Sequence, residues 1–406
     1  MKLERELALD VADTLRPFID DRQLAGVGAA VFRQGRLTHV ALGRRRLDAD
    51  LPVARDTIFR VASMTKPITT VAALALHDDG RFGLDDPITM CAPEFAELRV
   101  LRDAEGPLDQ CDPATRPITF RDLLTHRAGL TYAEFHLGPI GRALADTLGP
   151  TIDNPLAPAA WIERLASLPL IDQPGRGFHY GHSTDLLGFL IARLEGLPLG
   201  EVLRRRVFAP LGMADSGFAV PPAARHRCAG LCGFDAGGQL TALDEVPGGH
   251  ARQQRPDDMT FESGGQGLWS TLDDYLAFAR MLIGDPASPT LLRAETRALM
   301  TSNQLSAAQR ATTRLLGQAV FAGGHGYGFG VAVVTDPATA DPVRCRGGVG
   351  TVGWPGAYGG WWQADPTDGS VAIFLAHNMV DLPQMANGIG LGVWGAIAAF
   401  HGVATK

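Results

Sequence analysis

The segment FRVASMTKPITT, residues 59–70, places Ser63 three residues before Lys66 at the start of a predicted helix. The residues that follow are apolar and rich in alanine, Pro67 falls in the first turn, where its missing N–H is tolerated, and Gly80 marks the end. Side chains three residues apart share a helical face, so the Ser63 hydroxyl and the Lys66 amine are expected within hydrogen-bonding reach, with the serine at the positive end of the helix. The segment therefore predicts a nucleophile beside a base.

Lysine is rare in this chain. Of 37 lysine and arginine residues, only Lys2, Lys66 and Lys406 are lysines, so Lys66 is the single internal one. An exposed cation can be either residue, whereas only a lysine amine gives up its proton near neutral pH once it is desolvated or lies beside other cations. This usage favours a catalytic S-x-x-K pair over a chance match on a helix surface.

Composition excludes several classes of protein. With 406 residues, 46% of them apolar, the chain can bury a large core in two or three compact units. A net charge of −7 and a pI near 5.9 argue against a nucleic-acid partner. The first residues are interrupted by charges and no apolar run reaches a membrane-spanning length, so neither a signal peptide nor an anchor is expected. The five scattered cysteines do not form a disulfide pattern, and we expect a cytoplasmic protein.

Strand patterns occur at both ends of the chain. Helical apolar spacing covers 4–22, and the expected strands are 26–32, 37–42, 328–334, 345–349, 357–363 and 371–376, followed by a helix over 382–400. Neither group of strands can form a stable sheet with its own core. We therefore expect one antiparallel sheet, with the first and last helices packed on it.

The middle of the chain carries mostly helix signals. Thr119 begins a capping-box pattern, Ser183 is the expected N-cap of a helix that ends at Gly196, and Thr271 starts another. The predicted fold class is α+β: residues 1–80 and 301–406 form a split α/β domain, and 81–300 form an inserted helical domain, with the active site at the junction. Two long Gly/Pro-rich connections, 131–158 and 218–265, are expected to wall that site.

Seven motifs follow in an order that carries a family resemblance. They are SMTK at 63–66, LDDP at 84–87, ITFRDLLTHRAGL at 118–130, YGH at 180–182, PLGM at 210–213, GLWST at 267–271 and WPGA at 354–357. The chain resembles the serine β-lactamase and penicillin-binding fold, in particular the carboxylesterases that look like class C β-lactamases. The resemblance spans most of the chain and implies the same α+β fold, with an acyl-enzyme formed on Ser63.

The second catalytic motif of this family is a tyrosine, any residue, and usually an asparagine. Tyr180 matches the tyrosine, and His182 stands in place of the asparagine. A phenol is a useful base at neutral pH only where nearby cations favour its anion, and Lys66 can supply that charge. The alternative is that Tyr180 is a half-buried aromatic at a helix entry. His182 could replace the asparagine as a hydrogen-bonding group, belong to a proton path or line the site, and we favour lining.

The third motif departs from the β-lactamase pattern. Where β-lactamases carry lysine-threonine-glycine, this chain has Trp354-Pro355-Gly356, close to the tryptophan-glycine-glycine of the related esterases. Loss of the cation favours a neutral ester over an anionic antibiotic, although Trp354 could instead be a core residue. The resemblance implies an oxyanion hole formed by the N–H groups of Ser63 and Ala357. The expected substrate-binding residues are Trp354, Gly356, His182, Tyr132 and Phe135.

Other motifs are weak. The glycines of 348–353 match G-x-G-x-x-G without a βαβ unit, no serine completes G-x-S-x-G, and no H-E-x-x-H or paired C-x-x-C occurs. We therefore expect neither a metal nor a cofactor. His126 is expected to be structural. No E-x-x-L-N motif supplies a glutamate for the deacylating water, so deacylation would depend on Tyr180 and Lys66.

The sequence thus predicts a serine carboxylesterase that hydrolyses short-chain esters through an acyl-enzyme on Ser63, with Lys66 and Tyr180 sharing the acid and base roles. The partner expected is a small-molecule ester, and the sequence does not define an oligomeric state. A β-lactamase, an acyltransferase or an amide hydrolase of the same fold is the enzymatic alternative. An alternative of another class is a penicillin-binding protein without turnover, or an interaction protein.

Overall fold

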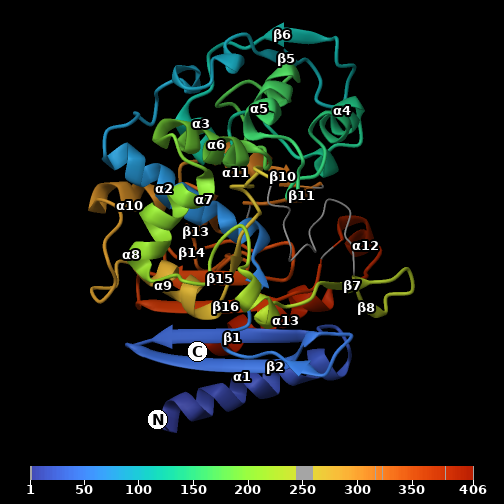
Figure 1. The fold of residues 1–406 in the computed structure, drawn as a ribbon, viewed down its shortest axis with the longest axis vertical. Coiled ribbons are helices and arrows are strands. Elements are labelled where there is room, and N and C mark those ends of the chain that lie inside the picture. Colours follow the sequence, from blue (N-terminus) through green and yellow to red (C-terminus); the bar gives the residue numbers. More distant parts are fainter. Residues whose placement is uncertain (1, 244–258, 316, 322, 380, 406) are drawn as a thin grey trace.

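One antiparallel sheet of eight strands organises the molecule (Figure 1). The computed structural model describes residues 2–243, 259–315, 317–321, 323–379 and 381–405. In sheet order the strands are β12 (His325–Tyr327), β13 (Ala332–Val334), β14 (Val352–Gly353), β15 (Trp361–Asp365), β16 (Ser370–Ala376), β1 (Gly26–Arg33), β2 (Arg36–Arg46) and β3 (Leu51–Pro52). Strand β1 pairs with β16 in a register that sets Ala29 opposite Phe374. The prediction that both chain ends build one sheet is confirmed.

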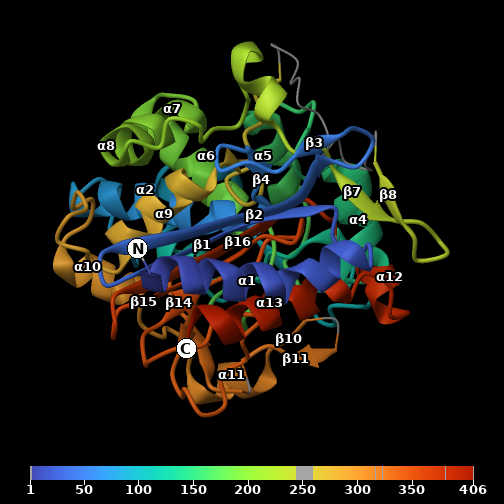
Figure 2. The same cartoon turned by 90° about the horizontal axis from the view of Figure 1, so that it is seen from below.

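Helices cover both faces of this sheet. The terminal helices α1 (Lys2–Asp20) and α13 (Gly392–Ala404) lie side by side on one face (Figure 2), and their apolar side chains, such as Leu15 and Phe400, pack with Phe374 of β16. Every residue of β16 is buried, since α9 (Leu272–Leu282) contacts the other face. Each large apolar side chain buried in this way contributes about 1.5–3 kcal/mol.

The C-terminal strand predictions were partly wrong in detail. The stretch 328–334 contains a turn in which Gly330 has a φ of 71°, so only its last residues form β13. No strand forms over 345–349, and the short strand β14 lies a few residues later. The helix expected over 382–400 is divided into α12 (Leu382–Ala386) and α13, because Gly388 and Gly390 between them adopt positive φ angles of 82° and 78°.

The region between the two halves of the sheet is mostly helical, as expected, but also contains short hairpins. Its helices are α2 (Thr65–Asp78), α3 (Phe120–Leu124), α4 (Pro139–Leu148), α5 (Pro158–Ser167), α6 (Ser183–Glu195), α7 (Leu199–Leu203), α8 (Ala209–Leu211), α9, α10 (Ala294–Met300) and α11 (Ala307–Thr312). Shorter helical turns are η1 (Ala62–Met64), η2 (Ile88–Met90), η3 (Pro93–Phe95), η4 (Ala133–Phe135), η5 (Arg204–Phe208) and η6 (Pro222–Arg227). The short strand pairs are β4 (Phe59–Arg60) with β9 (Trp269–Ser270), β5 (Arg99–Leu101) with β6 (Cys111–Pro113), β7 (Cys232–Phe234) with β8 (Leu240–Ala242), and β10 (Arg314–Leu315) with β11 (Gln318–Ala319). The division at residues 80 and 300 stays a prediction.

Two of the three predicted helix starts are confirmed by their side chains. The hydroxyl of Thr119 accepts the Asp122 N–H in a capping box, and that of Thr271 accepts the Asp274 N–H. Ser183 is not an N-cap: His182 occupies that position, and the Ser183 hydroxyl lacks a hydrogen-bond partner among the described residues.

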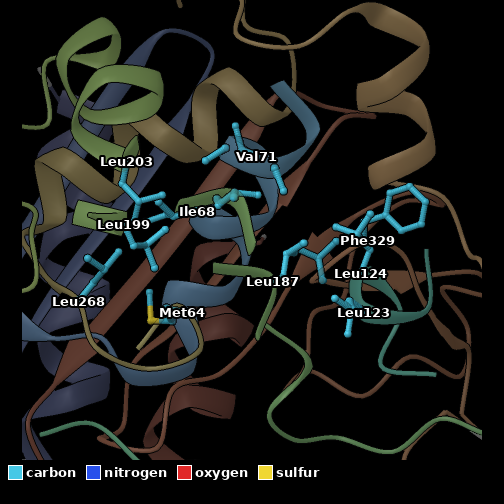
Figure 3. Packing of buried hydrophobic residues seen from close by; sticks show 14 of the residues in the cluster. Met64, Ile68, Val71, Leu123, Leu124, Leu187, Leu199, Leu203, Leu268 and Phe329 are labelled. Carbon is cyan, nitrogen blue, oxygen red and sulfur yellow. The ribbon is translucent and has the colours of Figure 1, made fainter. Parts of the chain in front are cut away.

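Helix α2 passes through the centre of the molecule. All its residues from Thr65 to Leu76 are buried, and Figure 3 shows Ile68 and Val71 of this helix in one cluster with Leu199 and Leu203 of α7. A helix enclosed on all sides holds its first turn rigidly, and that turn carries Lys66. None of the helices in the described part of the chain is long and apolar enough to cross a membrane.

Candidate active site

Ser63 and Lys66 meet at the start of α2, as predicted. The Lys66 Nζ donates to the Ser63 Oγ over 3.3 Å. Ser63 keeps 7% of its surface exposed and Lys66 none. Ser63 lies in the tight turn η1 next to Ala62, whose φ of 46° is in the left-handed region. This conformation is unfavourable for alanine and is concentrated at functional sites in proteins.

The buried Lys66 amine has two further acceptors. Its Nζ donates to the Tyr132 hydroxyl over 3.3 Å and to the Gly265 carbonyl over 3.0 Å. An ammonium has three N–H groups, and the oxygens of Ser63, Tyr132 and Gly265 match that number. The amine is therefore fully hydrogen-bonded inside the protein, with one of its hydrogen bonds to Ser63.

Tyr180 lies beside Ser63 and Lys66, with its ring rather than its hydroxyl against the Lys66 amine. The predicted sharing of a proton with Lys66 would require the hydroxyl at that place. The Lys66 Nζ is 4.5 Å from the centre of the Tyr180 ring, and the Tyr180 hydroxyl accepts the indole N–H of Trp354 over 2.9 Å. The described hydrogen bonds thus connect Lys66 to Tyr132 rather than to Tyr180.

Trp354 and Gly356 both lie at the site: Trp354 packs among its aromatic side chains, and Gly356 approaches the backbone before Ser63. Trp354 is 6% exposed, with its ring 5.4 Å from that of Tyr327 in a small aromatic cluster and its N–H on Tyr180. A Cβ on Gly356 would lie 2.5 Å from the Val61 carbonyl oxygen, so only glycine fits there. This close approach brings the exposed Ala357 to the turn that carries Ser63. The oxyanion role of Ser63 and Ala357 stays a prediction.

The remaining predicted binding residues surround Tyr132. Its ring lies 4.6 Å from the ring of His182 and 6.0 Å from that of Phe135. Phe135 is partly exposed, whereas His182 is 4% exposed and also packs on Trp161. His182 therefore lies behind Tyr132, and its Nδ1 is 3.2 Å from the Asp185 carboxylate. The part of the expected wall that falls on 244–258 lies outside the described residues.

Asp185 is the functional candidate that the sequence analysis missed. It is fully buried, and its Oδ1 accepts the Ser263 hydroxyl over 2.6 Å and the Gly265 N–H over 2.9 Å. Burial raises the pKa of Asp185, but hydrogen bonding to His182 and Ser263 and attraction to His182 and Lys66 outweigh it, so the net pKa is lowered. The available signal was its place five residues after Tyr180, but an aspartate in a first helical turn is also common without any function.

His126 lies beside the site as a neutral side chain, and its structural role stays a prediction. It is buried against the Tyr180 ring at 4.9 Å, and its Nε2 lies 3.4 Å from the Thr184 hydroxyl. Burial, and next the Lys66 charge, hold the pKa of His126 well below its usual range. No cluster of three or more His, Cys, Asp or Glu side chains suited to a metal ion occurs among the described residues.

Ser63, Lys66, Tyr132 and Tyr180 thus form one cluster, in a fold whose antiparallel sheet is covered by helices on both faces. A family model described as Beta-lactamase matches residues 11–389, and the chain belongs to this family. The predicted resemblance and the β-lactamase-like fold are thereby confirmed.

Two relatives and one solved structure place the chain within this family. It is similar to protein Rv1367c of Mycobacterium tuberculosis, with 41% identity over 375 residues, which are 91% of this chain and 90% of that protein. It is similar to esterase EstB of Burkholderia gladioli, with 33% identity over 369 residues, which are 88% and 87% of the two chains. The structure of EstCE1, a hydrolase with promiscuous acyltransferase activity, has a TM-score of 0.80 at 24% identity, covering 98% of this chain and all of that one, which shows a common fold.

Proposed function

We propose that the protein is a serine carboxylesterase that hydrolyses short-chain esters through an acyl-enzyme on Ser63. The observation that carries this proposal is the 3.3 Å hydrogen bond between the fully buried Lys66 amine and the Ser63 hydroxyl. The 33% identity to a protein named as an esterase supports the same reaction. A buried amine beside a serine hydroxyl is the arrangement needed to remove the hydroxyl proton as the serine attacks.

The reaction then follows from the residues around Ser63. The Ser63 oxygen attacks the ester carbonyl while its proton passes to Lys66, and the developing oxyanion is held by the N–H groups of Ser63 and Ala357. The proton is returned to the departing alcohol, and a water molecule deprotonated by the Lys66 and Tyr180 pair releases the acid. In this proposal Lys66 and Tyr180 share the acid and base roles as a pair.

The preference for a neutral ester rests on Trp354. Its indole contributes a neutral N–H where β-lactamases carry a lysine, and that N–H is used by Tyr180. A substrate carboxylate would therefore lack its usual cation at this position. Tyr132 and Phe135 add aromatic surface next to Lys66 and Tyr180.

Acyl transfer is a second candidate, since an acyl-enzyme reacts with an alcohol as well as with water. It is favoured by the fold shared with EstCE1, whose description includes acyltransferase activity. We also propose a cytoplasmic location, which is supported by five cysteines that are all free thiols.

The test is steady-state turnover of a short-chain nitrophenyl ester by the wild type and by Ser63→Ala. We expect many turnovers by the wild type and none above background by the variant. Equal rates in the two proteins would overturn the assignment. A single burst of product equal to the enzyme concentration, without further turnover, would instead support a protein that is acylated and stops.

A further inference from the structure

Besides the Ser63 hydroxyl, Lys66 has two acceptors, and one buried carboxylate holds both of the residues that supply them. The Tyr132 hydroxyl, which accepts from Lys66, donates to the Asp185 Oδ2 over 3.4 Å. Gly265, whose carbonyl accepts from Lys66, donates its own N–H to the Asp185 Oδ1 over 2.9 Å. The Ser263 hydroxyl fixes the same turn through its 2.6 Å bond to Oδ1.

This arrangement determines where the Lys66 lone pair points. A neutral amine has two N–H groups and one lone pair, and it can act as a base toward Ser63 only if the lone pair faces the serine hydroxyl. Two fixed acceptors, the Tyr132 hydroxyl and the Gly265 carbonyl, occupy the two N–H groups. The remaining direction is the 3.3 Å approach to Ser63.

We propose that Asp185 is a positioning residue for catalysis, which orients the Lys66 amine toward Ser63 by fixing the Tyr132 hydroxyl and the Gly265 carbonyl. This inference rests on the proposed serine esterase function. Asp185 does not touch the reacting atoms and acts through Tyr132 and through the 263–265 turn.

The residues around Asp185 explain why position 185 requires a carboxylate and position 265 requires a glycine. A Cβ on Gly265 would lie 2.9 Å from both the Asp185 Oδ1 and the Tyr132 hydroxyl, so any other residue would separate the two. Asp185 is fully buried and accepts from neutral donors on three sides, and His182 lies on the fourth. These donors hold the Asp185 side chain as a carboxylate anion, and a neutral replacement would change both its charge and the group that it presents to Tyr132.

The decisive variant is Asp185→Asn, which keeps the volume and can still accept from Ser263 and Gly265 but presents an NH₂ group to Tyr132. The Tyr132 hydroxyl must then turn, and the Lys66 amine loses a fixed acceptor. We expect kcat/KM for the nitrophenyl ester to fall by about 10²-fold, mostly in kcat. Tyr132→Phe removes the same contact, so the double variant should lose no more than either single variant.

Asp274→Asn is the matched control. Asp274 is also a buried aspartate in the first turn of a helix, and it accepts from Ser216 and from the Asp215 N–H without contacting the site. We expect wild-type kcat/KM from this variant. Equal losses in both aspartate variants would show a general effect of removing a buried carboxylate and would overturn the proposal.

The split between kcat and KM separates orientation from stability. A misdirected Lys66 amine slows the chemical step on Ser63 without changing how the ester binds, so Asp185→Asn should lower kcat and leave KM nearly unchanged. A role in stability alone would reduce the amount of folded enzyme, and kcat per active site, counted from the acylation burst, would stay at the wild-type value.

The outcomes distinguish this inference from the function on which it rests. No Ser63-dependent turnover by the wild type would remove the proposed function itself. Wild-type rates in Asp185→Asn would overturn the positioning role alone. The same holds if the double variant loses activity by the product of the factors lost in Asp185→Asn and in Tyr132→Phe. Should Asp185→Asn fail to fold, Ser263→Ala and Tyr132→Phe test the two arms separately, and wild-type kcat in both would contradict the proposal.

Discussion

The indole N–H of Trp354 donates to the hydroxyl oxygen of Tyr180 over 2.9 Å. Both side chains are more than nine-tenths buried, so water competes little for this bond. The bond fixes the direction of the Tyr180 hydroxyl, while the ring of Tyr180 lies against Lys66. Trp354 therefore provides, without a charge, a donor where β-lactamases have the lysine of their third motif, and it serves Tyr180 as well as the wall of the site.

Trp354→Phe tests this relationship, because it keeps an aromatic ring and removes the N–H, together with part of the volume of the indole. We expect kcat/KM for a short-chain ester to fall about 10-fold, the scale of a buried hydrogen bond left unmade. Wild-type kcat/KM in Trp354→Phe would show that Trp354 is only a wall of the site.

Lys66→Arg keeps the charge and removes a group that can release its proton. Arginine stays protonated in proteins and its planar fork does not reproduce the three directions of the amine. We expect activity to fall by at least ~10²-fold, the usual scale for general acid–base catalysis. Circular dichroism should show a folded protein, and full activity would mean that Lys66 acts as a fixed charge.

Substrate preference follows from the neutral third motif. A short-chain nitrophenyl ester and a chromogenic cephalosporin, compared at equal enzyme concentration, should differ in kcat/KM by at least ~10-fold in favour of the ester, or about 1.4 kcal/mol in the transition state. A preference for the cephalosporin would indicate a β-lactamase that uses the same Ser63, Lys66 and Tyr180.

The raised pKa of Asp274 predicts how the free energy of unfolding changes with pH. Burial, and more weakly the charges of Asp215 and Asp273, raise the pKa of Asp274 to about 6 despite its hydrogen bonds. Since the native state binds this proton more tightly than the unfolded state, the contribution of Asp274 to stability is largest at low pH and is lost as the pH rises from about 4 to 6, by at most ~3 kcal/mol. The unfolding free energy of Asp274→Asn, measured relative to the wild type by denaturant titration, should therefore rise across that window. A constant difference would contradict this assignment.

Much of the fold was accessible from the sequence because its signals are local. Short apolar runs bounded by turn residues predicted the strands β1, β2 and β16, and the requirement for a shared core joined them in one sheet. The strand expected over 345–349 was wrong, because this stretch, CRGGV, bends at Gly347 and Gly348 and continues into a turn. Glycines at 388 and 390 divided the last helix for a reason that only their positive φ angles reveal.

The site was predictable to the extent that it lies in short motifs. Ser63 and Lys66 share a helical turn, and Tyr180 was located through a motif that precedes α6. The contacts of Asp185 could not be predicted, because they reach Ser263 and Gly265 about 80 residues away and one of them ends on a backbone N–H. The mistaken N-cap at Ser183 has a related cause: the first turn of α6 is organised by the contact between His182 and Asp185.

The central claim is that Ser63 carries the acyl group during turnover. The most direct measurement is mass spectrometry of the protein quenched during reaction with a short-chain ester, using Tyr180→Phe to slow deacylation. We predict one acyl group per chain, located by peptide mapping on Ser63 and missing from Ser63→Ala. An acyl group on another residue, or rapid hydrolysis by the wild type with no adduct in either Tyr180→Phe or the wild type, would contradict the account.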